Sequence, residues 1–350
     1  MTQRTYVDAV NTALHLAMEK DSNLVAFGLG INDPKRIFGT TSGLVEKFGQ
    51  DRVFDTPTSE NTMTGVQVGL ALAGIPSIVT HQRLDFFLLA MDQLVNSAAK
   101  WHFMFGSQQP VPITIRLIIG KGWGQGPTHS QALHAWFSHI PGLKVIAPSN
   151  PRDAKELTLA AIEDPNPVLI LEHRWLHNSL GEFDDSYSLG EIGKVRSLTQ
   201  GKDVTVVGSS FLTAKLLGLN ALIKDLDLDM ELLDLRSYSP IDWGGIFESV
   251  RRTGSLIVFD YGHTSGSIAG EIIAKVTENC FSSLKEPPVR FAVKDLPEGT
   301  SFGYTRDQYF KDEDMICAIF KAGGKTLARE IELRSTTPHD VPSEDFKGPF

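Results

Sequence analysis

The stretch Ile113-Thr-Ile-Arg-Leu-Ile-Ile119 decides the fold, because a run of β-branched and aliphatic residues predicts a strand that is buried on both faces. Shorter runs of the same kind occur at residues 25–28, 78–80 and 167–172. Apolar residues at helical spacing occupy the first 20 residues and the segments 63–73, 86–103 and 151–161. Strands that alternate with helices in this way predict a parallel α/β sheet.

A second alternation follows a segment of low apolar density between residues 175 and 201. Its expected strands are 204–207, 230–235, 256–259 and 289–293, and its expected helices are 214–223, 246–250 and 269–276. The sequence therefore predicts an α/β protein of two doubly wound domains, at residues 1–178 and 203–335, joined by a linker at 179–202. The tail, 336–350, has no periodic pattern, and we expect it to hang free or to lie on a partner.

Composition excludes several classes of protein. The chain has 350 residues, of which 41% are hydrophobic and 21% charged, so it can bury a core and is not disordered. Its net charge of −9 argues against nucleic acid as a partner. No apolar run is long enough for a membrane span or a signal peptide, so we expect a cytoplasmic protein with no membrane partner. Two cysteines, Cys280 and Cys317, cannot build a disulfide framework.

Common catalytic and nucleotide motifs do not fit. The glycines of Gly120-Lys-Gly-Trp-Gly-Gln-Gly-Pro127 match neither the dinucleotide fingerprint nor the P-loop. The sequence also lacks a Gly-x-Ser-x-Gly elbow and a His-Glu-x-x-His helix, which are the usual signals of hydrolases. A less generic motif must therefore carry the function.

That motif begins at Arg52-Val-Phe-Asp-Thr-Pro-Thr-Ser-Glu60. Taken alone, Glu60 is typical of an exposed carboxylate in the first turn of a helix. Gly65 and Gly69 follow it at a spacing of four, which lets another backbone approach a helix closely, as at a subunit contact. Leu88-Leu-Ala-Met-Asp-Gln-Leu-Val-Asn-Ser-Ala-Ala-Lys100 and Thr128-His-Ser-Gln-Ala-Leu-His-Ala-Trp-Phe-Ser-His-Ile-Pro-Gly-Leu-Lys-Val-Ile-Ala-Pro-Ser149 continue the series.

These segments, together with Ile162-Glu-Asp-Pro-Asn-Pro167 and Leu235-Arg-Ser-Tyr-Ser-Pro240, resemble the β subunit of the thiamine-diphosphate-dependent first component of 2-oxoacid dehydrogenases. The resemblance covers roughly residues 4–330 and implies a pyrimidine-binding domain followed by a transketolase C-terminal domain. It implies a subunit that decarboxylates a 2-oxoacid and passes the acyl unit to lipoamide or another acceptor.

In this family the α subunit holds the cofactor's diphosphate and Mg²⁺ through a Gly-Asp-Gly motif. The present chain contains no Gly-Asp pair, so the resemblance implies that it supplies only the pyrimidine half of the site. An α partner is then required, and the expected assembly is α2β2, with a lipoyl acyltransferase as a further candidate partner.

The resemblance also assigns roles to individual residues. Glu60 is implied as the carboxyl group that activates the aminopyrimidine through N1′. Thr58, Gln82 and Phe86 are implied in the cofactor pocket, where Phe86 would cover the pyrimidine ring. His129 is implied in the channel through which the acyl group leaves, and His134 and His139 are expected to be structural.

The resemblance also implies an ion site. The carbonyl oxygens of Ala161, Asp164 and Asn166 match a K⁺ site of the family, although the residues alone indicate only a turn.

The chain departs from common members of the family at Thr62, at the segment His81-Gln-Arg-Leu84 and at His263-Thr-Ser-Gly266. The first two departures lie close to the expected cofactor position and bear on substrate and acceptor.

Two other functions stay open at this point. One is a two-subunit thiamine-diphosphate enzyme of transketolase or synthase type, which joins the activated fragment to a carbonyl acceptor. The other is a non-catalytic assembly subunit, which the joint presence of Glu60, Phe86 and His129 disfavours.

Overall fold

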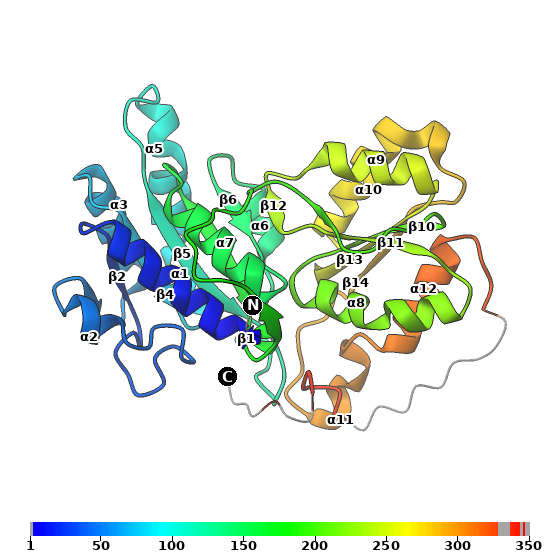
Figure 1. Ribbon diagram of the computed structural model, residues 1–350, viewed down its shortest axis with the longest axis horizontal. Helices are drawn as coiled ribbons and strands as arrows, with labels where there is room; N and C mark the ends of the chain where they lie inside the picture. Colours follow the sequence, from blue (N-terminus) through cyan, green and yellow to red (C-terminus); the bar gives the residue numbers. More distant parts are fainter. Residues whose placement is uncertain (1–2, 328–336, 344–345, 347–350) are drawn as a thin grey trace. The chain divides into compact units, whose positions relative to one another are not determined.

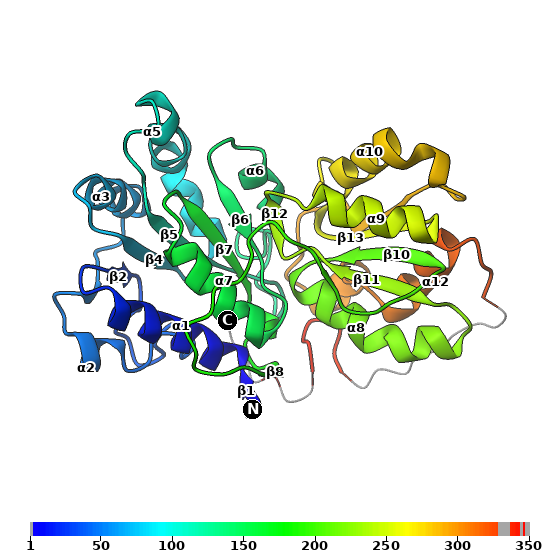
Figure 2. The ribbon, with the colours of Figure 1, turned by 45° about the horizontal axis from the view of Figure 1, so that its top comes forward.

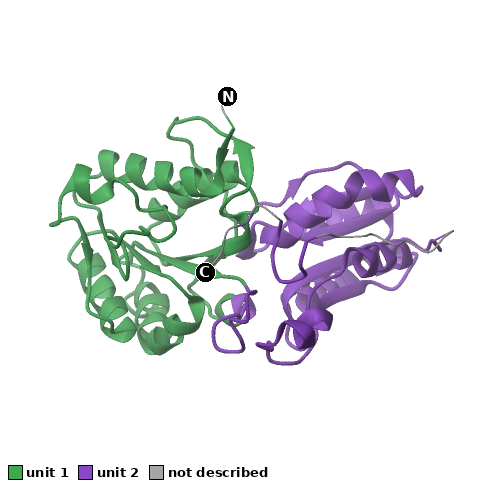
Figure 3. Ribbon diagram, turned by 90° about the horizontal axis from the view of Figure 1, so that it is seen from below, with its two compact units in different colours: residues 1–120, 136–192 green, residues 121–135, 193–350 purple. Residues whose placement is uncertain are grey.

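The computed structural model describes residues 3–327, 337–343 and 346. The chain divides into two compact units, which Figure 3 distinguishes by colour. Unit 1 contains residues 1–120 and 136–192, and unit 2 contains residues 121–135 and 193–350. The glycine-rich segment after Gly120 therefore groups with the C-terminal half, although it interrupts the N-terminal half of the sequence.

Unit 1 is built on a parallel sheet whose strands follow the order β6-β7-β5-β4-β2-β3. Figure 1 labels β6, β5, β4 and β2 of this sheet. The strands are β2 (Val25–Gly28), β3 (Val53–Asp55), β4 (Ser77–His81), β5 (Ile113–Ile119), β6 (Lys144–Ile146) and β7 (Val168–His173). Every residue of β4, β5 and β7 is buried, so both faces of the central sheet are covered.

The helices of unit 1 are α1 (Tyr6–Lys20), α2 (Leu44–Phe48), α3 (Glu60–Leu72), α4 (Leu84–Phe87), α5 (Ala99–Met104) and α7 (Pro151–Ile162). A Thr5–Asp8 capping box begins α1, which packs beside α7 (Figure 2). β1 (Gln3–Thr5) pairs with β8 (Leu180–Glu182), and α6 (His134–Ser138) spans the change from unit 2 to unit 1.

The helix expected at residues 86–103 is interrupted. Between α4 and α5 the chain passes through a 3-10 turn at Leu88–Ala90 and a π-helix at Gln93–Ala98. Side-chain hydrogen bonds inside this stretch, from Asn96 to Asp92 at 2.7 Å and from Ser97 to Gln93 at 3.3 Å, accompany the change of pitch. Apolar spacing alone could not distinguish these helix types.

Unit 2 has a second sheet, in the order β14-β13-β10-β11-β9, that is parallel except for the edge strand β9. Its strands are β9 (Arg196–Ser197), β10 (Val204–Gly208), β11 (Met230–Asp234), β13 (Leu256–His263) and β14 (Val289–Val293), and β12 (Ser237–Ser239) also belongs to unit 2. Its helices are α8 (Ser210–Asp225), α9 (Trp243–Thr253), α10 (Ile268–Cys280), α11 (Phe302–Thr305) and α12 (Asp312–Ala322).

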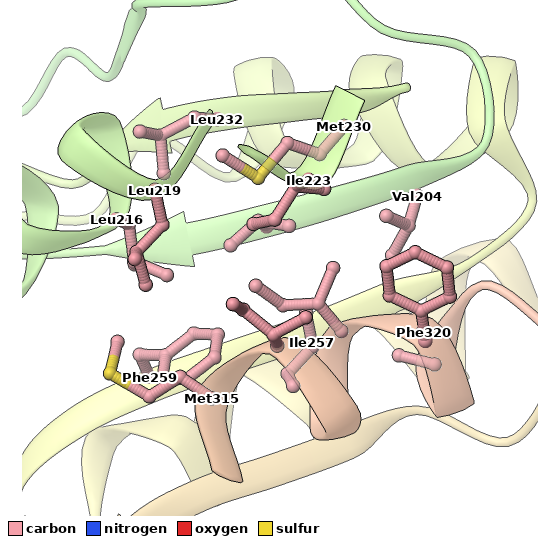
Figure 4. Close-up of a cluster of buried hydrophobic side chains, with 14 of the residues drawn as sticks. Val204, Leu216, Leu219, Ile223, Met230, Leu232, Ile257, Phe259, Met315 and Phe320 are labelled. Carbon is pink, nitrogen blue, oxygen red and sulfur yellow. The ribbon is translucent and has the colours of Figure 1, made fainter. Parts of the chain in front are cut away.

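The core of unit 2 lies where α8 and α12 meet this sheet, as Figure 4 shows. Leu216 and Ile223 of α8 and Met315 of α12 are fully buried there. The prediction of two α/β domains is confirmed. No helix in the described ranges is both long and apolar enough to cross a membrane.

The expectation that the tail hangs free is wrong for its described residues, and its contact with a partner stays a prediction. Asp340 accepts a hydrogen bond from the backbone N–H of Trp123 at 3.2 Å, and the ring of Phe346 stacks on that of Trp123. An aromatic residue outside any helix or strand gives no periodic signal, so the sequence could not reveal this contact.

An ion pair stabilises the middle of the unit 1 sheet. Nε and Nη2 of Arg116 lie 2.6 and 2.9 Å from the two carboxylate oxygens of Glu172, and both side chains are completely buried. Nη1 of Arg116 also donates to Thr80 at 3.3 Å. The pair therefore joins β5 to β7, and its guanidinium also reaches β4.

Replacing Glu172 with Gln should lower the free energy of unfolding by about 3–5 kcal/mol, because it leaves a buried guanidinium without its counter-charge. Denaturant unfolding of the purified chain measures the loss. Glu156→Gln is the matched control, since Glu156 pairs with the exposed Arg152, and it should cost about 1 kcal/mol or less. Equal losses in the two variants would contradict a structural role for the buried pair.

Candidate functional site

The parallel strands of unit 1 bring the loops after β2, β3 and β4 to one edge of the sheet. Gly28, Asp55 and Thr80 lie level with one another across these strands. Because all three strands run in the same direction, the residues that follow them emerge together. Thr58 and Glu60 follow β3, while Gln82 and Phe86 follow β4, so the topology brings four predicted site residues to this edge.

Hydrogen bonds tie these loops to one another. The carboxylate of Asp55 accepts from the backbone N–H groups of Ile31 at 2.7 Å and Asn32 at 3.1 Å. The backbone N–H of Thr56 donates to the carbonyl of Gly28 at 3.0 Å. The segment that leads to Glu60 is thereby fixed against the end of β2.

Glu60 is the first residue of α3 and only 5% exposed. Its backbone carbonyl accepts from the hydroxyl of Thr64 at 3.0 Å, but within the described ranges no group makes a hydrogen bond or ion pair with its carboxylate. The interpretation of Glu60 as an exposed first-turn residue is therefore wrong. A carboxylate that lies in a largely buried residue and has no protein partner is open to a hydrogen-bond donor from a ligand.

Gln82 is held by the loop after β2. Its Nε2 donates to the carbonyl of Leu29 at 3.2 Å. Gly30 has a φ of +79°, and a Cβ atom at this position would lie 2.2 Å from Gln82 Nε2. The absence of a side chain at Gly30 thus lets the Gln82 amide lie against the backbone next to the site.

Aromatic and basic side chains continue the segment after β4. Phe86 is 41% exposed, so part of its ring faces outward, whereas Phe87 is buried and packs on His81 with ring centroids 4.9 Å apart. Burial lowers the pKa of His81 to about 4. His81 is therefore neutral at physiological pH and packs as an aromatic ring.

Arg83 is a buried cation at the same edge that the sequence did not single out. Its Nη1 donates to the carbonyl of Gly120 at 3.3 Å, and the side chain is 5% exposed. Burial lowers the pKa of Arg83 to about 10, against the opposing effect of Asp85. It stays charged at neutral pH and adds positive charge to this edge of the sheet. In the sequence, the position of this arginine among apolar and aromatic residues was the available sign that it lies in the site.

His129 lies in unit 2, on the glycine-rich loop, whereas Thr58, Glu60, Gln82 and Phe86 belong to unit 1. Its Nδ1 is 3.1 Å from the hydroxyl of Thr128. Farther along, His134 is buried, with Nε2 2.7 Å from the carboxylate of Asp260 and its ring stacked on Tyr238. Burial raises the pKa of Asp260, but contacts with His134 and two backbone N–H groups outweigh burial and lower it. These contacts support the structural role expected for His134.

The segment expected to bind K⁺ forms the turn between α7 and β7. The carbonyl of Ala161 accepts from the hydroxyl of Thr114 at 3.1 Å, and the carboxylate of Asp164 accepts from the backbone N–H of Asn166 at 3.0 Å and pairs with Lys144. The buried Oδ1 of Asn166 has no hydrogen-bond partner within the described residues. The geometry of this turn is compatible with a cation held by carbonyl oxygens.

The unit 1 edge carries side chains of the kinds that can contact a flat heteroaromatic ring. It offers a partnerless carboxylate at Glu60, an amide at Gln82 and a half-exposed ring at Phe86. In the described part of the chain, no group of three or more His, Cys, Asp and Glu side chains could bind a metal ion.

Two family models match the chain. The model described as "Transketolase, pyrimidine binding domain" matches residues 2–178, and "Transketolase, C-terminal domain" matches residues 193–316. A solved structure named "Split gene transketolase, inactive beta4 tetramer" superposes with a TM-score of 0.73 at 21% identity, over 93% of this chain and 99% of that one. At this identity the superposition supports the fold alone.

Three characterised relatives are similar over most of their length. The chain is 37% identical to "Acetoin:2,6-dichlorophenolindophenol oxidoreductase subunit beta" of Bacillus subtilis, over 89% of this chain and 94% of the relative. It is 36% identical to "Pyruvate dehydrogenase E1 component subunit beta-1, mitochondrial" of Arabidopsis thaliana, over 91% and 89%. It is 34% identical to "2-oxoisovalerate dehydrogenase subunit beta" of B. subtilis, over 89% and 95%.

Replacing Gly30 with Ala should lower the free energy of unfolding by about 1 kcal/mol more than Gly49→Ala, because the added Cβ displaces Gln82 and breaks its hydrogen bond. Gly49 is the matched control, since its φ is +80° and a Cβ there would meet nothing within 4 Å. In a Gln82→Ala background the difference between the two alanine variants should shrink, and only the looser contact of the added Cβ with the Asp33 carboxylate, at 3.0 Å, should remain. Denaturant unfolding of both alanine variants in both backgrounds measures this, and a difference of the same size without the Gln82 side chain would contradict this geometry.

Proposed function

The chain is a member of the β subunits of thiamine-diphosphate-dependent 2-oxoacid dehydrogenases, and from that membership we propose the part that its own residues take in the reaction. The family uses thiamine diphosphate and pairs β subunits with α subunits in a tetrameric arrangement. We propose that this chain contributes the wall of the cofactor site that receives the aminopyrimidine ring.

The single observation that carries this proposal is the environment of Glu60. Its carboxyl group is almost fully buried, has no partner within the described residues and lies at the sheet edge where ligands of parallel α/β folds bind. A carboxyl group in this position can share a proton with a ring nitrogen of the cofactor. The residues present therefore fit the group that the family requires.

The bound cofactor would supply a carbon nucleophile that attacks the 2-oxoacid and stabilises the carbanion left after decarboxylation. Glu60 would hold the proton at N1′ that lets the aminopyrimidine act as a base. Gln82, fixed by Leu29, would offer a polar contact to the ring, and Phe86 would cover one ring face. Thr58, which is exposed on the segment before α3, would complete the rim.

His129 would act after decarboxylation, at the transfer of the acyl unit. Its imidazole lies on the glycine-rich loop, with Nδ1 beside the hydroxyl of Thr128. An imidazole can move protons near neutral pH, as a thiol acceptor requires when it takes the acyl group. The acceptor would be lipoamide or another compound of equivalent reactivity. No observation favours transfer to a carbonyl acceptor, as in a transketolase or synthase.

We propose that activity requires an α subunit that holds the diphosphate and Mg²⁺, in an α2β2 assembly. The sequence has no Gly-Asp pair for this purpose. The exposed face of α3 supports a subunit contact, because a Cβ at Gly69 would meet nothing within 4 Å and a second backbone could approach there. Gly65 differs, since a Cβ there would lie in ordinary contact with the side chain of Gln93, at 3.7 Å. The turn at Ala161, Asp164 and Asn166 remains our candidate for a K⁺ site, and a lipoyl acyltransferase remains a candidate partner.

Replacing Glu60 with Gln should reduce turnover of the complex co-expressed with its α partner by about 10² to 10⁴, because an amide cannot exchange the N1′ proton. Steady-state decarboxylation with an artificial electron acceptor measures the effect. Glu182→Gln, on the exposed edge strand β8, makes the same chemical change away from the site and should leave the rate unaltered. Parental turnover in the folded, cofactor-loaded Glu60 variant would rule out the proposed role.

A further inference from the structure

The glycine-rich loop of unit 2 has an unusual backbone. Gly120, Gly122, Gly124 and Gly126 all have positive φ, between +69° and +139°. Trp123 lies among them with a φ of +47°, a conformation that side chains other than glycine seldom adopt. Such a residue persists only when its surroundings hold it there, so the contacts of Trp123 decide the conformation of the loop.

The C-terminal segment, residues 337–343 and 346 as the structure describes them, makes two of those contacts. A carboxylate oxygen of Asp340 accepts a hydrogen bond from the backbone N–H of Trp123 at 3.2 Å. The ring of Phe346 stacks on the indole, with centroids 5.0 Å apart and an interplanar angle of 23°. Asp340 and Phe346 are 9% and 7% exposed, so both are packed against the unit. The segment thus holds both the backbone and the side chain of Trp123.

His339 anchors this segment to the body of unit 2. Its Nε2 is 3.0 Å from the hydroxyl of the buried Thr305. Its ring lies 4.4 Å from that of Phe302 and 5.1 Å from that of Tyr309, measured between centroids. His339, which precedes Asp340, is therefore fixed by contacts that do not involve the glycine-rich loop.

The rest of the loop is held separately. Lys121 is buried, donates to the carbonyl of Gln308 at 2.8 Å and lies 3.5 Å from the carboxylate of Glu298. Gly124 and Gly126 pack so closely on Thr300 that a Cβ atom on either would lie under 3.0 Å from it. Loss of the C-terminal contacts should therefore release Trp123 without unfolding the loop's attachment to unit 2.

We propose that Asp340 and Phe346 are positioning residues that hold Trp123, and with it the loop that carries His129, in the conformation needed for acyl transfer. The inference rests on the role proposed for His129. The family model of the C-terminal domain ends at residue 316, so this segment lies outside the matched region. The C-terminal segment would then be a part of the chain, outside the matched domain, that sets the conformation of the glycine-rich loop.

Hydrogen exchange of the full-length chain tests the structural part without reference to activity. Phe346→Ala and Asp340→Asn should each speed amide exchange in residues 121–127 by up to about tenfold, because a stacking contact or a charge-assisted hydrogen bond is lost. Exchange in β10 and β13 should not change. Phe346→Tyr should restore the slow exchange, and Phe281→Ala, at a ring that is 74% exposed, is the matched control.

Kinetics of the co-expressed complex test the functional part. In the Phe346→Ala and Asp340→Asn variants, the rate of acyl transfer to free lipoamide divided by the rate of dye-linked decarboxylation should fall about tenfold. Phe346→Tyr should restore this ratio. A general loss of stability would lower both rates together and leave the ratio unchanged.

Unchanged exchange in residues 121–127 would overturn the inference, and so would faster exchange with an unaltered ratio. A parental complex that decarboxylates no 2-oxoacid would instead overturn the proposed function, and the exchange result would still decide whether the segment holds the loop.

Discussion

The close approach of β2 and β4 at Gly28 is the constraint on which the candidate site depends. A Cβ atom at Gly28 would lie 2.4 Å from the carbonyl oxygen of Thr80, so only glycine fits between the strands at that level. Because the strands meet there, the loop after β2 can reach Gln82 and the loop after β3 can be bonded back to β2. Glu60 and Gln82, far apart in sequence, are brought to one edge by this packing.

Much of the fold could be predicted because long, buried strands give a strong local signal. The stretch at β5 is wholly apolar except for Thr114 and Arg116, and the helices α1, α7 and α8 lie where apolar spacing indicates helix. The short strands β3 and β6 were not predicted, since three residues have no period to detect. The edge strand β9 was missed within the low-apolar segment for the same reason.

The candidate site was predictable only in part, since its residues were found through a family resemblance rather than a local pattern. Local pattern alone made Glu60 an exposed first-turn carboxylate, whereas the structure buries it. Whether a charge is buried depends on neighbours that are distant in sequence, and for this reason the burial of Arg83 and Lys121 could not be predicted from the residues around them. The contact between Phe346 and Trp123 joins residues more than two hundred positions apart and could not be found from either segment alone.

The central claim is that this chain forms only the aminopyrimidine half of a shared cofactor site. Calorimetric titration of thiamine diphosphate, with Mg²⁺, into the isolated chain and into the co-expressed complex tests it most directly. The account predicts saturable, Mg²⁺-dependent binding by the complex and no saturation of the isolated chain over the same concentrations. Tight Mg²⁺-dependent binding by the isolated chain would contradict it.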